Sequence, residues 1–417
     1  MTQPEPRPIM LLTGGPVTQT LWAPLAERYD LVFLYPAAAQ QAAALGLTAA
    51  PIAALMDGDI QEHIANEAVM LSARVVAGLP NVSTCIGAAY EDTAPAALNG
   101  HLHEWFPGYI HHLLTAEIAL LAQLERLSAS GRRIVGCITH EDVSPEPRTL
   151  INWANVKGIP TIHVPHAPCH LLPGVVDIHR ETRAKWIAAS GPAVAEFYSA
   201  SGHDSSFITV TGGPQYDWMY TDAPTRTRAR EILLGDDLPK YAGKPMLCYQ
   251  TTWGQTTSLR SEFETEFTQG WQAVLAVAKE IGAFVMVKVH WNDTRPETLE
   301  RYDSDLRAAG VPGLVTRDHM LYVLAAADCL VAQGPSNMCL EAAMVGTPSA
   351  YIQTADFDFT TPLPYRGTAE TIGAAIRAAL DSAGRDEWQD FVSQYNDAHP
   401  EGDATSRVVA MVEQICQ

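Results

Sequence analysis

The sequence has no long hydrophobic run, few basic residues and no closely spaced cysteines. No apolar stretch in its 417 residues approaches the ~20 residues that a membrane-spanning helix needs. Its 27 basic and 47 acidic side chains give a net charge of −20, which argues against a protein that coats nucleic acid or lies on an anionic membrane. The 7 cysteines are dispersed without a CxxC pair, as is typical of free thiols in a reducing compartment. We therefore expect a cytoplasmic protein without integral membrane contact.

Several catalytic motifs are also missing. Neither GxSxG, GxxxxGK[ST] nor HExxH occurs, and Gly14-Gly15-Pro16 does not match GxGxxG. These absences argue against serine hydrolases, P-loop enzymes and typical dehydrogenases. Three histidines and a cysteine lie within residues 163–170, but their spacing matches no standard zinc pattern. We expect neither a metal site nor a resident cofactor.

Short β-branched runs alternate along the chain with longer stretches whose apolar residues recur at helical spacing. This alternation predicts an α/β fold with mainly parallel sheets. The predicted strands are residues 9–12, 31–34, 134–139, 161–164, 207–210, 246–250, 284–289, 314–316, 329–332 and 349–352. The predicted helices are residues 60–78, 108–130, 261–281, 296–309, 319–327, 337–345 and 369–381.

The alternation is interrupted once, in residues 221–245, which are rich in proline, glycine and charge. We therefore predict two Rossmann-like domains, residues 1–235 and 236–417, whose parallel sheets face a central cleft. The last helix is free to cross back to the N-terminal domain. In such folds ligands bind at the carboxyl ends of the strands, so the residues there are the candidates for a site.

Two strand ends of the second half suit a phosphate ligand. Lys288 and His290 close an apolar strand and, two residues apart, share one face. Gly334, Ser336 and Asn337 stand between a strand and a helix whose N-terminus offers N–H groups to a phosphate, with Ser336 as the predicted N-cap. The alternative is structural: a lysine whose charged end reaches water and a histidine that caps the strand.

Further positions extend this predicted donor site. Glu341 lies one turn into the same helix, where a carboxylate can accept hydrogen bonds from a ribose or sugar. Gly213 belongs to the turn Thr211–Asp217, which follows a predicted strand, and an interdomain turn is the alternative reading.

Polar residues also follow two strands of the first half. His166 stands just past the strand at 161–164 and is the best candidate for a general base. His140, Glu141 and Asp142 follow the strand at 134–139, where paired carboxylates beside a histidine can orient a substrate or tune a base. Helix capping explains these carboxylates equally well.

Taken together, these positions resemble the GT-B superfamily of nucleotide-diphosphate-dependent transferases, and within it the CDP-glycerol glycerophosphotransferase-like branch is most similar. UDP-N-acetylglucosamine 2-epimerases share the architecture and a similar C-terminal pattern. The chain departs from the first branch at Ala167, Gln215, Trp291 and Pro335, where glycine, a basic residue, proline and serine are usual. The resemblance is carried by residues 322–342, Lys288 with His290, Thr211-Gly212-x-Pro214-x-x-Asp217, Thr251-Thr252-Trp253 and His166-Ala167.

The resemblance implies a metal-independent glycosyltransferase that uses a nucleotide-diphosphate sugar, most simply a UDP-sugar, as co-substrate. Lys288 and His290 would counter the charge of the leaving diphosphate, and Thr252 would join the donor site. His166 or Asp142 would take the proton from the acceptor hydroxyl. The acceptor stays open among a glycan, a small molecule and a modified DNA base, and the chain could form a homodimer.

Three alternatives remain at this point. A UDP-N-acetylglucosamine 2-epimerase-like enzyme would use Glu141 and Asp142 as acid and base. A phage-type glycosyltransferase of hydroxymethylated DNA bases would need the basic residues 180–185 and 226–230 as its contact surface. A binding protein that kept the fold without its chemistry is the third.

Overall fold

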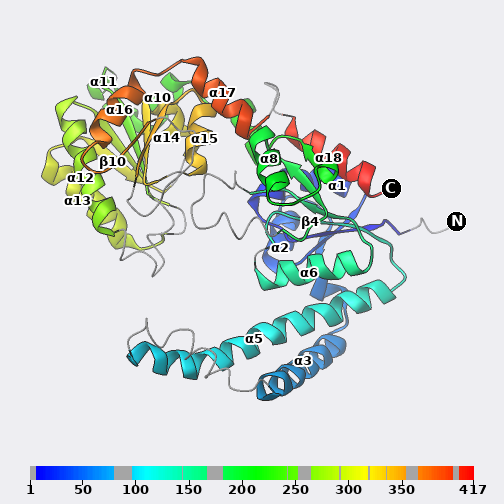
Figure 1. The fold of residues 1–417 in the computed structure, drawn as a ribbon. Coiled ribbons are helices and arrows are strands. Elements are labelled where there is room, and N and C mark those ends of the chain that lie inside the picture. The colour runs from blue at the N-terminus through cyan, green and yellow to red at the C-terminus, as the bar shows by residue number, and fades with distance from the viewer. Residues whose placement is uncertain are drawn as a thin grey trace. The chain divides into compact units, whose positions relative to one another are not determined.

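The computed structural model describes most of the chain (Figure 1). The described residues are 6–78, 96–142, 144–166, 182–241, 243–251, 264–290, 293–317, 320–334, 336–353, 365–397 and 403–417. The chain divides into two compact units. The first comprises residues 1–164, 181–188 and 408–417, and the second comprises residues 165–180 and 189–407.

The first sheet has seven strands in the order β3-β2-β1-β4-β5-β6-β7, with parallel pairing from β3 to β6. Its interior strand β1 is buried on both faces, because Ile9 and Leu11 enter one hydrophobic core while Met10 and Leu12 enter another. The strands are β1 (Ile9–Leu12), β2 (Asp30–Phe33), β3 (Ala49–Pro51), β4 (Ile134–Thr139), β5 (Thr161–His163), β6 (Trp186–Ala189) and β7 (Ile208–Val210).

Helices cover both faces of the β1 region. The long helices α3 and α5 pack against each other, and the last helix contributes Val408 and Val412 to the core that holds Met10 and Leu12 (Figure 1). Residues 408–417 therefore belong to the first unit although they end the chain. The helices are α1 (Gln19–Ala26), α2 (Pro36–Ala44), α3 (Gly58–Gly78), α5 (Ala96–Ala129), α6 (Pro145–Val156) and α18 (Ala404–Ile415).

The second sheet has six parallel strands in the order β10-β9-β8-β11-β12-β13. Its core includes a ring cluster in which Trp271 contacts Tyr249 and Tyr302 at centroid distances of 4.5 and 5.3 Å. The strands are β8 (Met246–Gln250), β9 (Phe284–Lys288), β10 (Gly313–Thr316), β11 (Cys329–Ala332), β12 (Ser349–Ile352) and β13 (Arg366–Gly367). The helices of the second unit are α8 (Pro192–Ala200), α9 (Asp217–Thr221), α10 (Arg226–Leu234), α11 (Leu238–Tyr241), α12 (Glu264–Glu280), α13 (Pro296–Ala309), α14 (Met320–Ala326), α15 (Asn337–Met344), α16 (Ile372–Leu380) and α17 (Asp386–Tyr395). Among them α8 packs on β7 of the first sheet.

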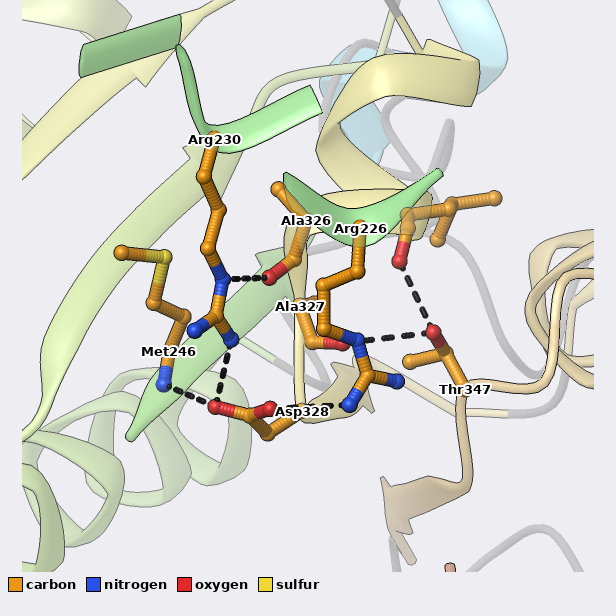
Figure 2. A network of polar contacts seen from close by, with 8 residues as sticks. Arg226, Arg230, Met246, Ala326, Ala327, Asp328 and Thr347 are labelled. Carbon is orange, nitrogen blue, oxygen red and sulfur yellow. Dashed lines mark hydrogen bonds and ion pairs between the residues drawn. The ribbon is translucent and has the colours of Figure 1, made fainter. Parts of the chain in front are cut away.

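The amino edge of the second sheet is fastened by Asp328 (Figure 2). Its carboxylate accepts hydrogen bonds from Arg226 Nη1 at 3.1 Å, Arg230 Nη2 at 2.8 Å and the backbone N of Met246 at 2.8 Å. Arg230 also donates from Nε to the Ala326 carbonyl. This network ties α10 to the start of β8 and neutralises two of the three arginines in residues 226–230; the third, Arg228, pairs with Glu231.

The two parallel sheets confirm the predicted α/β fold, and β1, β4, β8, β11, β12 and α13 have the predicted bounds. One helix was predicted too short: α5 begins at Ala96 rather than at 108. The helix therefore runs through Pro107 and Gly108, two poor helix formers, which the helical spacing of the apolar residues does not reveal. The short strands β3 and β6 were not predicted, because four or fewer residues carry little periodicity.

Candidate functional site

The carboxyl end of β9 carries a buried cation. Lys288 is 6% exposed, and its Nζ donates hydrogen bonds to the carbonyls of Val289 at 3.1 Å and Arg317 at 2.6 Å. Burying a charge is unfavourable unless polar groups surround it, and these carbonyls supply part of that compensation. Lys288 is therefore a positive charge held in place at the edge of the second sheet.

His290 follows on the same strand end and is half-buried. Its backbone N donates to Thr251 Oγ1 at 3.0 Å, which fixes the end of β9 against the end of β8. Burial, followed by the charge of Lys288, lowers the pKa of His290 to about 4, against the opposing effect of Asp293. At neutral pH Lys288 thus supplies the positive charge, and His290 supplies a neutral imidazole.

Asp293 fixes the loop after β9 and was missed by the sequence analysis. Its fully buried carboxylate accepts from Arg295 Nη2 at 2.7 Å, Arg295 Nε at 2.9 Å and Thr298 Oγ1 at 3.0 Å. Its backbone N donates to the His290 carbonyl at 2.9 Å. The Arg295 guanidinium lowers the pKa of Asp293 to about 2, so this carboxylate stays ionised. Through its backbone N, Asp293 also fixes the position of His290 after the strand.

Ser336 is the N-cap of α15, as predicted. Its Oγ accepts from the backbone N of Met338 at 3.1 Å and donates to Gln250 Oε1 at 3.1 Å. Gly334, just before it, has a φ of +82° with open space where a Cβ would point, so the left-handed backbone and not crowding favours glycine there. The N-terminus of this eight-residue helix can bind an anion through its first N–H groups.

Two side chains on one face of α15 have buried acceptor atoms without hydrogen-bond partners among the described residues. They are Glu341 Oε2 and, one turn earlier, Asn337 Oδ1. Asn337 Nδ2 donates to the His166 carbonyl at 3.5 Å. Burial raises the pKa of Glu341 to about 7, and the charge of Lys288 acts in the opposite direction. This face of α15 presents two buried acceptors for which the described part of the chain supplies no donor.

The turn at residues 211–217 packs beside α15 through α9. A Cβ on Gly213 would lie 2.7 Å from Cδ2 of Tyr216, so glycine here makes room for the Tyr216 ring. The backbone N of Gly213 donates to Asn396 Oδ1 at 2.7 Å. Asp217 has a structural role, since its carboxylate accepts from the backbone N of Ala404 and Thr405 at the start of α18. Gly213 thus belongs to the site through its neighbour Tyr216, a residue that the motif had left unassigned.

In the first unit the two predicted carboxylates are engaged locally. Asp142 is 2% exposed, and its Oδ2 accepts from Thr182 Oγ1 at 2.8 Å and from the backbone N of Arg183. Glu141 Oε1 accepts from the backbone N and the Oγ of Ser144 at 2.9 and 2.6 Å. These are the contacts of carboxylates that hold loops, in line with the capping alternative.

A histidine that sequence analysis left without a role lies at the ends of β1 and β4. The His140 ring lies so close to Gly15 that a Cβ there would be 2.6 Å from Cε1, and Gly15 has a φ of +104°. Thr13 Oγ1 lies 3.2 Å from His140 Nδ1. This contact explains Gly15, whereas Gly14 is explained by Ala38, whose Cβ would lie 2.5 Å from a Cβ on Gly14. In the sequence, this contact of His140 could have been found from the two glycines and the histidine that follow neighbouring strands.

The remaining predicted residues are placed as follows. His166 is partly buried and reaches Asn337 through its carbonyl, while Thr252 lies outside the described residues. Within the described ranges, no group of three or more His, Cys, Asp or Glu side chains could hold a metal ion. None of the helices that the structure describes combines the length and apolar character needed to cross a bilayer.

No protein-family model matches the chain, and no curated protein matches its sequence. Solved structures do match. A UDP-GlcNAc 2-epimerase from Neisseria meningitidis bound to UDP-GlcNAc superposes with a TM-score of 0.56, over 97% of this chain and 99% of that chain, at 10% identity. A putative UDP-N-acetylglucosamine 2-epimerase from Listeria monocytogenes gives 0.55 over 97% and 95%, at 14% identity, and an S. aureus MnaA–UDP co-structure gives 0.53 over 98% and 96%, at 12% identity. The chain has the GT-B fold. This confirms the fold that the sequence resemblance implied.

Proposed function

We propose that this GT-B protein is a nucleotide-sugar-dependent transferase that moves a sugar or a related group from a nucleotide-diphosphate donor to an acceptor hydroxyl. The observation that carries the proposal is the buried Oε2 of Glu341, one turn beyond the Ser336 N-cap, which has no hydrogen-bond partner among the residues that the structure describes. A nucleotide donor offers both complements, since its diphosphate suits the helix N-terminus and its hydroxyls suit the carboxylate. The UDP and UDP-GlcNAc bound in structures of the same fold support this choice of ligand.

The strand ends of the second sheet supply the rest of the donor site in this proposal. Lys288 provides the positive charge opposite the diphosphate, and the neutral imidazole of His290 provides a hydrogen bond to the leaving oxygen. Negative charge from a bound diphosphate would raise the pKa of His290, so that donor binding itself favours protonation of the leaving group. His166 remains the proposed base for the acceptor hydroxyl. Because Oδ2 of Asp142 accepts from Thr182 and Arg183, which is the arrangement of a carboxylate that holds a loop, we do not assign Asp142 a proton-transfer role.

A second candidate, a nucleotide-sugar 2-epimerase, is favoured by the solved structures of this fold. It would require acid and base carboxylates, and the two that the sequence offered in the first half, Glu141 and Asp142, are both tied to neighbouring backbone and hydroxyl groups. The DNA-base alternative loses its proposed contact surface at residues 226–230, where Arg226 and Arg230 are paired with Asp328.

Thermal-shift measurements with nucleotides, followed by incubations of nucleotide sugars with and without an acceptor, test the proposal. Thermal shifts with UDP, CDP, ADP and GDP identify the donor base, since a ligand at 100-fold over its Kd adds ~2.7 kcal/mol of stability. The corresponding nucleotide sugars are then incubated alone and with candidate acceptors. A transferase releases nucleoside diphosphate when an acceptor is added, whereas an epimerase converts the sugar alone. Lys288→Met should weaken nucleotide binding, while Lys279→Met, which removes the same charge from an exposed position on α12, should not. A protein that binds none of the nucleotides contradicts the proposal.

A further inference from the structure

The loop that carries His166 leaves the first sheet and belongs to the second unit. β5 ends at His163, and Val164 still donates its backbone N–H to the Thr139 carbonyl of β4 at 2.8 Å. The chain passes from the first unit to the second between Val164 and Pro165. The carbonyls of Pro165 and His166 therefore lie beyond the paired strands, where backbone groups need partners other than a neighbouring strand.

Two side-chain amides supply these partners. Gln215 Nε2 donates to the Pro165 carbonyl at 3.3 Å, and Asn337 Nδ2 donates to the His166 carbonyl at 3.5 Å. One donor lies in the turn that leads into α9 and the other is the first residue of α15, and α9 packs against α15. Each bond is long and, taken alone, weak. Together they fix two successive peptide groups, and with them the backbone of His166.

These contacts decide the orientation of both amides. An amide turned over would place its oxygen against a carbonyl oxygen, so the N–H groups must face the loop. The other ends of the amides, Gln215 Oε1 and Asn337 Oδ1, are buried and have no hydrogen-bond partner of normal geometry among the described residues. Burying an acceptor in this state lowers stability. The chain keeps both amides in spite of this, which points to a functional use of their hold on the loop.

The turn around Gln215 directs this side chain toward the loop. The Gln215 carbonyl accepts a hydrogen bond from Trp218 Nε1 at 2.6 Å, which fixes the backbone from which the side chain projects. A Cβ on Gly213 would lie 3.2 Å from Gln215 Oε1, which is a tight contact. Glycine at this position therefore leaves room for the amide as well as for the Tyr216 ring.

We propose that Gln215 and Asn337 are positioning residues that hold His166 beside the N-terminus of α15. The inference rests on the proposed function, in which His166 is the base and this N-terminus binds the diphosphate. Asn337 is the first residue of α15, so a single side chain links the proposed base to the proposed phosphate site. The base and the donor site then belong to the same unit, which keeps the distance between the base and the reacting group constant.

Gln61 provides a matched control in the first unit. Its Nε2 donates to the carbonyls of Ala53 and Met56 at 2.8 and 2.9 Å, so it also ties a side-chain amide to backbone carbonyls. Gln61→Met and Gln215→Met remove the same amide and keep a side chain of similar size. Gln215→Lys restores an N–H donor. A requirement for the hydrogen bond predicts rescue by lysine, whereas a requirement for packing alone is met by methionine.

The first measurement follows His166 itself. Diethyl pyrocarbonate modifies neutral imidazoles, and mass spectrometry of the resulting peptides gives a labelling rate for each histidine. Gln215→Met should raise the labelling rate of His166 about fivefold, because the loop opens more often without this hydrogen bond. The rate should return to near the wild-type value in Gln215→Lys and stay unchanged in Gln61→Met. An unchanged rate in Gln215→Met, or an equal rise in Gln61→Met, overturns the inference.

The second measurement separates positioning from binding. Release of nucleoside diphosphate from the nucleotide sugar and acceptor identified by the incubations above should be about tenfold slower in Gln215→Met at saturating donor, and should recover in Gln215→Lys. The Kd for UDP, measured by calorimetry, should change by less than about twofold. An unchanged rate with a Kd about tenfold weaker would assign Gln215 to donor binding and overturn the inference.

The two measurements also distinguish this inference from the proposed function. If UDP, CDP, ADP and GDP all fail to bind, the proposed function is overturned, and the labelling rates alone decide whether the amides hold His166. Should Gln215→Met fail to fold, Gln215→Glu takes its place, because it keeps the size of the side chain and loses the N–H donor. A wild-type labelling rate of His166 in that variant overturns the inference.

Discussion

Carboxylates at the strand ends of the two sheets have opposite surroundings. At the end of β4, Glu141 and Asp142 accept hydrogen bonds from Ser144, Thr182 and Arg183. On α15, the helix that follows β11, Glu341 has a buried oxygen for which no described residue is a hydrogen-bond partner. The residue type and its place in the α/β pattern are alike, so the difference lies in the neighbours. A buried carboxylate with local donors holds a loop, whereas one without them is available to a ligand.

The histidines extend the comparison. His140 lies beside Thr13 Oγ1 and against Gly15, inside the first unit. His290 is held by its backbone to Thr251 and Asp293 and carries a depressed pKa beside Lys288. The surroundings of His290 leave its imidazole neutral next to the fixed cation of Lys288. This pair is better suited than His140 to bind an anionic ligand.

The largest effect is expected from His290→Ala. If His290 acts on the leaving diphosphate, the rate of nucleoside diphosphate release should fall by about 10²–10³, while nucleotide affinity falls less because the α15 N-terminus remains. Single-turnover rates and melting temperature measured together decide the matter. A destabilised variant that keeps its full rate would show that His290 only closes the strand.

Glu341→Gln should reveal the cost of keeping a partnerless carboxylate. The pKa of Glu341 is raised to about 7 from 4.5, so the folded protein holds an extra proton between these values and loses stability as pH rises through them. Glutamine has no charge to bury. We therefore expect the variant to be more stable than the wild type above pH 7, by up to ~3 kcal/mol, with the difference vanishing below about pH 5. Denaturant unfolding at several pH values measures this, and a pH-independent difference would count against it.

Asp142→Ala should behave in the opposite way. Removal of this carboxylate leaves Thr182 and the Arg183 N–H without their acceptor, so we expect a loss of about 2 kcal/mol in the free energy of unfolding. Nucleotide affinity should be unchanged. A stable Asp142→Asn variant without turnover would instead make Asp142 a catalytic candidate again. It would contradict the view that the carboxylates after β4 only hold loops.

Ser336→Ala is expected to have the smallest effect. Loss of the N-cap should cost about 1 kcal/mol of stability, because the Met338 N–H loses its side-chain acceptor. Nucleotide affinity should fall several-fold through the less ordered start of α15. Thr225→Ala, which removes the N-cap of α10 on the same unit, is the control: equal destabilisation is expected, with no change in affinity.

Much of the architecture follows from local patterns. Strands β8 and β11 are apolar runs of four or five residues, and their bounds could be predicted from the sequence because every residue in them is buried on a two-faced sheet. The N-cap of α15 could also be predicted from the sequence, since Ser336 stands two residues after Gly334 and directly before a helical run. The extent of α5 was not, because Pro107 and Gly108, two poor helix formers, stand inside the helix and the helical spacing was read only from residue 108.

The sequence by itself determined the order of the elements and the chemistry at each strand end: Lys288 and His290 on one, Glu341 beyond another. Only the tertiary structure decided which groups have partners. Asp142 accepts a hydrogen bond from Thr182, 40 positions away, Gly213 donates to Asn396 across more than a hundred residues, and Asp328 joins two arginines of α10 to the start of β8. Periodicity reports which face of an element is buried, but hydrogen bonding depends on distances between elements, and these are set by how the sheets and helices pack.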